Sequence, residues 1–185
     1  MLTKLRTKII LSATILLGAG LIGSLLLFAV YCIPTEKIIQ NVSSGSETFL
    51  IEGATFDYAP GYKSSILDNV TDAIMLSETV FSPCQNPFHD AMAVPRYVYE
   101  NRATPELSLM AFLYNDTETE RHIATYPRYW HGYLIFLKPF FYFFDYSDSR
   151  IFHLGMQGHL LVSSRICAAD CPTCTLVAFP VSLSP

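Results

Sequence analysis

Charged residues are scarce in this sequence of 185 residues. It contains 12 Lys and Arg and 16 Asp and Glu, so charged residues make up 15% of the chain against 51% hydrophobic residues. Because soluble domains carry roughly 25% charged residues, this balance favours a membrane protein. The net charge is −4 and there is no basic stripe. The sequence therefore lacks the electrostatic footprint of a nucleic-acid-binding protein.

Several motifs of soluble enzymes are also absent. The sequence has no Gly-rich phosphate loop, no G-x-S-x-G nucleophile elbow and no H-E-x-x-H helix. The enzyme classes that depend on these motifs for phosphate binding, acyl transfer or zinc proteolysis therefore have no support. The sequence leaves the cofactor unknown, and it leaves both an enzyme and a non-enzyme open.

A charge-free run is present near the N-terminus, at residues 9–34. It exceeds the ~20 apolar residues that cross a bilayer. It is also longer than the apolar region of a signal peptide, which has about 7–15 residues. Tyr31 before Cys32 suits neither a signal-peptide cleavage site nor a lipoprotein site. We therefore predict an uncleaved transmembrane helix over residues 9–33.

Basic residues precede this helix and predict its orientation. Lys4, Arg6 and Lys8 lie within the first eight residues, and no acid lies among them. Because basic residues favour the cytoplasmic side, we predict that residues 1–8 are cytoplasmic. Residues 34–129 then form a loop-rich extracytoplasmic unit, and the protein is located in the cell membrane.

The clearest helical pattern of the outer unit is at residues 63–81, where apolar residues recur three and four apart. Ser65 followed by Asp68 resembles a capping box at the start of a helix. Asp68 and Asp72 are four residues apart and would project from the side opposite the apolar stripe. Paired carboxylates can bind a hard cation or take part in acid–base catalysis, and a solvated helix face is the alternative.

An aromatic stretch follows the outer unit. From Trp130 to Phe144 there are only fifteen residues, too few for a span, and Lys138 lies near their middle. Trp and Tyr favour the headgroup zone of a bilayer. We therefore predict an interfacial helix over residues 130–147, bent near Pro139, with Lys138 reaching toward lipid phosphates.

The last part of the chain is less regular. Residues 148–166 are a candidate second transmembrane helix, although two serines and an arginine interrupt its apolar run. Cys167, Cys171 and Cys174 follow with C-x3-C-x2-C spacing, which resembles the cluster motif of radical S-adenosylmethionine enzymes. Only eleven residues follow the last cysteine, too few for the barrel of those enzymes, and a zinc site needs a fourth ligand. We predict a Cys-rich tail over residues 167–185 and no metal site.

Two stretches together resemble a known group of proteins. They are "SSILDNVTDAIML" and "YWHGYLIFLKPFFYFFDYSDSRIF", and "IPTEKIIQNV" after the first span adds to them. Residues 8–158 resemble the start of an uncharacterised family of multipass membrane proteins from Gram-positive bacteria. The layout is similar to that of GT-C type membrane glycosyltransferases, which have a first span, an outer loop with a catalytic acid, an interfacial helix and further spans.

The resemblance implies a fold and a function. It implies a mainly α-helical membrane protein of the cell envelope, a fragment of a protein that transfers sugars from polyprenyl-phosphate donors. Asp68 or Asp72 would be the loop acid, and Arg128, His131 and Lys138 would meet the lipid phosphate. His131 has a simpler interpretation as a polar tip on an aromatic helix. The alternative function is a single-span, membrane-anchored binding or structural module without catalytic activity, whose partner in either case includes the lipid bilayer.

Overall fold

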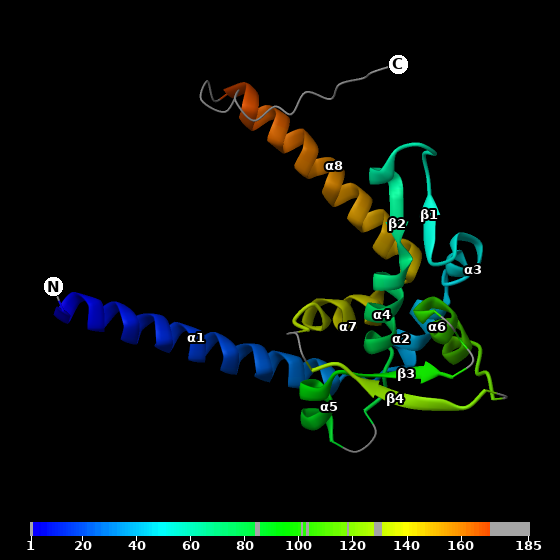
Figure 1. Ribbon diagram of the computed structural model, residues 1–185, viewed down its shortest axis with the longest axis horizontal. Helices are drawn as coiled ribbons and strands as arrows, with labels where there is room; N and C mark the ends of the chain where they lie inside the picture. Colours follow the sequence, from blue (N-terminus) through cyan, green and yellow to red (C-terminus); the bar gives the residue numbers. More distant parts are fainter. Residues whose placement is uncertain are drawn as a thin grey trace. The chain divides into compact units, whose positions relative to one another are not determined.

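A computed structural model describes most of the chain. Two compact units are present, residues 1–146 and residues 147–185, and each is described by itself. The described residues are 2–83, 86–100, 102, 104–117, 119–127 and 131–170. Figure 1 shows that the described part is mainly helical, which confirms the predicted fold class at this level.

The elements of the first unit are short except for the first helix. In chain order they are α1 (Leu2–Tyr31), α2 (Glu36–Ser43), α3 (Thr48–Glu52), β1 (Thr55–Asp57), a 3-10 turn (Lys63–Ser65), β2 (Ile66–Asp68), α4 (Asn69–Thr79), α5 (Pro87–Ala93), β3 (Pro95–Tyr99), α6 (Pro105–Leu113), β4 (Arg121–Thr125) and α7 (Leu134–Phe143). The strands form two separate antiparallel pairs, β1 with β2 and β3 with β4. In the second pair Tyr97 lies opposite Ile123.

Helix α1 confirms that an N-terminal helix is long and apolar enough to cross a membrane. Residues Arg6–Tyr31 form a continuous apolar segment, and within the described part of the chain α1 is the one helix that meets both requirements. Most of its side chains are exposed, but Leu27, Val30 and Tyr31 are buried. These last turns pack against α5 and α7. The C-terminal end of α1 is therefore part of the folded unit.

From residue 147 onward, helix α8 (Tyr146–Asp170) forms the described part of the second unit. It is helical throughout residues 148–166, the candidate second span. In its first turns the His153 ring Nδ1 lies 2.8 Å from the Ser149 carbonyl oxygen. Its length and hydropathy together do not reach those of a membrane span.

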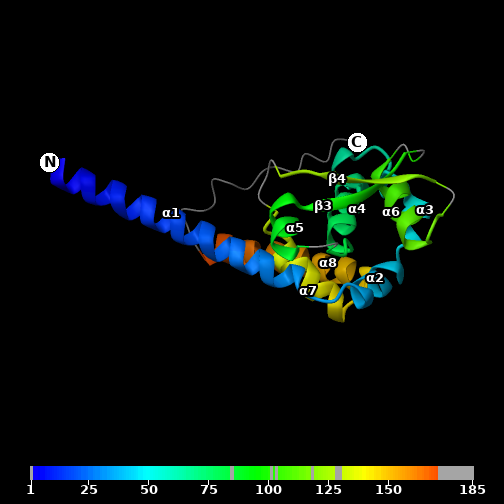
Figure 2. The same ribbon diagram turned by 90° about the horizontal axis from the view of Figure 1, so that it is seen from below.

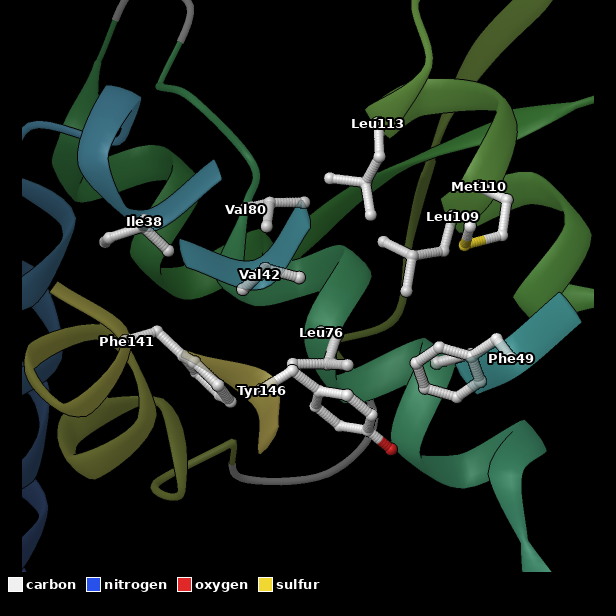
Figure 3. Close-up of a cluster of buried hydrophobic side chains, with 11 residues drawn as sticks. Ile38, Val42, Phe49, Leu76, Val80, Leu109, Met110, Leu113, Phe141 and Tyr146 are labelled. Atoms are coloured by element: carbon white, nitrogen blue, oxygen red, sulfur yellow. The ribbon is translucent and has the colours of Figure 1, made fainter. Parts of the chain in front are cut away.

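The main core of the first unit joins helices that are far apart in the sequence. Figure 3 shows side chains from α2, α3, α4, α6 and α7 pointing toward one another. Tyr146 adds an aromatic ring that stacks on Phe49 at 5.0 Å. The buried members of this cluster are Ile38, Val42, Phe49, Ala73, Leu76, Val80, Leu109, Met110, Leu113, Phe141 and Tyr146.

The predicted helix over residues 63–81 starts later than expected. Residues Ile66–Asp68 form strand β2 instead, and Leu67 lies opposite Phe56 of β1. The Ser65 hydroxyl does not cap a helix, because it donates to the Asp57 carboxylate. Pairing with β1 is a contact between distant residues that a local periodicity does not reveal.

The aromatic stretch forms α7, which is shorter than the predicted interfacial helix over residues 130–147. Leu134, Lys138 and Phe141 share one face of α7 and are buried in the protein. Phe136 and Phe143 are exposed on other sides of the helix. One face of this helix therefore packs on protein, and its contact with a membrane surface stays a prediction.

Candidate functional site

Asp68 acts as the N-cap of α4. Its carboxylate accepts a hydrogen bond from the Thr71 backbone N–H at 3.1 Å and one from the Thr71 hydroxyl at 2.6 Å. These bonds lower the pKa of the Asp68 carboxyl below its ordinary value. A capping side chain satisfies a backbone donor that the first turn of a helix leaves without a partner. Asp68 therefore has a structural role in an exposed position.

Asp72 lies in the first turn of the same helix and is also exposed. Its carboxylate accepts from the Tyr146 hydroxyl at 3.5 Å, a long contact. An acid in the first turn also interacts favourably with the helix dipole. The structure thus places both predicted acids at one end of α4, with a different hydroxyl partner for each.

Two substitutions of Asp68 distinguish the effect of its charge on stability from the effect of its cap. We expect Asp68→Ala to lower the free energy of unfolding by about 1 kcal/mol, because it removes the cap. Asp68→Asn should cost only a few tenths of that, because Asn is an equally good cap. Urea denaturation of the full chain in detergent micelles measures both. Equal losses for the two variants would contradict the capping role.

The phosphate-binding prediction requires Lys138 to lie at the surface, but the structure buries it. Its side chain is 0% exposed. The ammonium donates to the Thr79 carbonyl at 2.8 Å and to the Phe81 carbonyl at 3.2 Å. It also lies 4.5 Å from the centre of the Tyr31 ring, a cation–π contact. Lys138 therefore donates hydrogen bonds to carbonyl groups at the C-terminal end of α4, where the helix dipole is negative.

Burial makes the Lys138 ammonium a stronger acid than an exposed lysine. Removal from water lowers the pKa of Lys138 to about 7. Desolvation has this effect because it disfavours the charged ammonium. The group thus titrates near neutral pH inside a contact that joins α1, α4 and α7.

A second buried polar group lies at the same end of α4. Glu78 is fully buried, and its carboxylate accepts a short hydrogen bond from the Tyr133 hydroxyl. The same Oε2 atom is 3.2 Å from Nδ1 of His131. Desolvation raises the pKa of Glu78 above its ordinary value. We call Tyr31, Glu78, His131, Tyr133 and Lys138 the polar junction.

The hydrogen bonds of His131 determine where its protons lie. Nε2 is 2.8 Å from the Tyr126 carbonyl, which only accepts, so Nε2 carries a hydrogen. Nδ1 lies 2.8 Å from the Tyr133 hydroxyl. The Tyr133 hydroxyl also donates to Glu78, so it contacts both the ring of His131 and the carboxylate of Glu78. Glu78, Tyr133 and His131 therefore form one buried chain of polar contacts.

The polar junction was only partly visible in the sequence. The sequence pattern indicates His131 and Lys138, but with a role at the membrane surface. It does not indicate a role for Glu78 or Tyr133. Glu78 stands four residues after Ile74 and three before Phe81, so it falls within the apolar stripe of residues 63–81. An acid at such a position was the available signal, because a buried carboxylate needs a partner.

The other predicted residues belong neither to the start of α4 nor to the polar junction. Arg128 lies outside the described residues, and so do Cys171, Cys174 and the side chain of Cys167. Among the residues that the structure describes, no group of three or more His, Cys, Asp and Glu side chains could hold a metal ion. Cys32, directly after the C-terminal end of α1, is a free, exposed thiol.

Comparisons with known proteins add no relative to this geometry. No family model, no curated protein and no solved structure matches the chain. The resemblance to GT-C type glycosyltransferases therefore stays a prediction.

Proposed function

We propose that the protein is a membrane-anchored binding or structural module of the cell envelope. The observation that carries the proposal is the exposure of α1. Only 17% of its most apolar stretch of 18 residues is buried in the protein. A soluble protein rarely leaves an apolar surface of this size in contact with water. A lipid bilayer would cover it, and the folded unit would be held at the membrane surface.

The direct continuation of α1 into the folded unit supports an anchoring role. Leu27, Val30 and Tyr31 belong to the same buried cluster as Phe81 and Leu134. The polar junction adds the cation–π contact of Lys138 with Tyr31. Because both kinds of contact hold the end of α1, the unit would follow the membrane helix rigidly and present its surface at a constant height.

Thiol labelling in intact cells tests the proposed orientation. We expect Tyr114→Cys, in a variant with its five native cysteines replaced by serine, to react with a membrane-impermeant maleimide. Tyr114 is exposed at the end of α6, so the new thiol is accessible. A matched Thr3→Cys variant should react only after lysis. Labelling of Thr3→Cys in intact cells, with Tyr114→Cys protected, would overturn the orientation.

A glycosyltransferase-like activity on polyprenyl-phosphate sugars is the second candidate. Asp68 and Asp72 favour it, since both carboxylates are exposed on the outer unit. The pKa of the Asp68 carboxyl lies below its ordinary value of 3.8, so this group is ionised at neutral pH. An ionised carboxylate can bind a divalent cation or accept a proton from an acceptor hydroxyl.

Isosteric variants test this activity without removing the helix cap. We expect Asp68→Asn or Asp72→Asn to abolish transfer of radiolabelled glucose from polyprenyl-phosphate glucose by membranes that contain the protein. Because Asn preserves the cap at residue 68, loss of folding does not explain the loss of transfer. Unchanged transfer in both variants, at equal membrane levels, would rule out a catalytic role for these acids.

A further inference from the structure

The length of α1 determines which part of the folded unit lies at the membrane boundary. A helix rises 1.5 Å per residue, so ~20 residues cross the hydrocarbon core of ~30 Å. Counted from Ile9, the first residue after the basic cluster, such a span ends at Phe28. Phe28 is therefore at the outer edge of the hydrocarbon, one residue after Leu27, the first buried hydrophobic side chain of the helix.

Helix α5 contacts α1 at this level. The Phe88 ring lies 6.1 Å from the Phe28 ring in an edge-to-face arrangement. Figures 1 and 2 both place α5 beside the C-terminal end of α1. Phe88 is therefore held at the height of Phe28, where the lipid headgroups begin.

The outer side of α5 is apolar and exposed. Phe88 is 53% exposed and Met92, four residues later on the same side, is 39% exposed, whereas Ala91 is fully buried. The Asn86 side chain caps the helix by accepting from the backbone N–H groups of Phe88 and His89. This cap fixes the start of the helix and therefore the direction of its exposed side.

We propose that Phe28, Phe88 and Met92 form a surface that lies in the headgroup region of the outer leaflet. The bilayer is the partner because this surface continues the lipid-facing surface of α1 without a gap at Phe28. The inference rests on the proposed membrane anchoring. It assigns α5 as a second contact with the membrane, which restricts tilting of the folded unit on its anchor.

Photocrosslinking in nanodiscs tests this contact. The full chain is reconstituted in phosphatidylethanolamine and phosphatidylglycerol, with Phe88→p-benzoylphenylalanine as the probe. A Leu17→p-benzoylphenylalanine variant reports the span, and Tyr114→p-benzoylphenylalanine is the exposed control. Both figures place α6, which ends beside Tyr114, at the end of the unit away from the N-terminus of α1. We expect lipid adducts at Phe88 at a level near that of Leu17 and several-fold above that of Tyr114.

The other outcomes of the crosslinking experiment distinguish an error in the α5 contact from an error in the membrane anchor. Lipid adducts at Leu17 with a background level at Phe88 would overturn the α5 contact and leave the anchor intact. Background levels at both positions would overturn the anchor, and the α5 contact with it. Crosslinks from Phe88 to a second copy of the chain, in place of lipid adducts, would show that this surface binds protein.

Discussion

Replacing Lys138 by Ala should lower the free energy of unfolding by about 3 kcal/mol. The variant removes the donor for the Thr79 and Phe81 carbonyls, and buried acceptors without partners cost about 1–3 kcal/mol. It also leaves a cavity beside the Tyr31 ring, since the side chain is completely buried. Urea denaturation of the full chain in detergent micelles, followed by circular dichroism, measures the loss.

Lys138→Met is the matched control for volume. It keeps most of the buried stem and removes only the ammonium, so we expect a smaller loss of about 1 kcal/mol. If Lys138→Ala and Lys138→Met were both as stable as the original chain, the contact between α4 and α7 would not depend on the ammonium. That result would contradict the role assigned to Lys138.

The difference in stability between the original chain and Lys138→Met should depend on pH. The pKa of Lys138 is about 7 in the folded protein, against an ordinary value of 10.5. Between these values the unfolded chain holds a proton that the folded protein has released, so the free energy of unfolding rises with pH. The original chain should therefore gain stability relative to Lys138→Met from about pH 7 upward. A constant difference across this range would show that Lys138 stays charged inside the fold.

Replacing Glu78 by Ala should have an effect of similar size, about 3 kcal/mol. It removes the acceptor of the Tyr133 hydroxyl and the carboxylate beside Nδ1 of His131. Breaking a buried polar pair from one side costs several kcal/mol, because the remaining group is neither paired nor hydrated. Glu78→Gln keeps the shape and an acceptor oxygen, so its loss should be about 1 kcal/mol.

The titration of Glu78 has the opposite sign to that of Lys138. Burial raises the pKa of Glu78 above 4.5, so the folded protein holds this proton at pH values where the unfolded chain has released it. Its stabilising contribution is therefore complete below about pH 4.5 and is lost as pH rises through the raised pKa. The difference in stability between the original chain and Glu78→Gln, measured from pH 4 to 8, should decrease with pH. An increase with pH would show that the carboxylate, not the acid, is the stable form.

The polar junction shows how much of a buried site a sequence pattern predicts. The positions of His131 and Lys138 were identified from an aromatic stretch with few charges, but their surroundings were not. Lys138 binds a carbonyl 59 residues away, and Tyr133 binds Glu78 across 55 residues. A local pattern predicts which side of a helix is apolar, but not which distant element covers that side.

Asp68 shows the same limit at short range. Its spacing from Asp72 predicts a shared helix face, whereas Asp68 precedes the helix and caps it. The difference arose because strand β1 pairs with residues Ile66–Asp68 and prevents the helix from starting earlier. Capping was a reasonable role for an Asp in any case, since this residue type is among the best N-caps.

By itself, the sequence determined the features that depend on neighbouring residues. The charge-free run of residues 9–34 predicts a helix of membrane-spanning length, because every turn of that helix is apolar. The tertiary structure alone decided that Lys138 and Glu78 are buried, because their burial depends on α1, α4 and α7 packing together. Burial changes the cost of a charge by far more than a neighbouring residue does. For that reason the same two side chains stabilise the core of this protein and do not form a surface site.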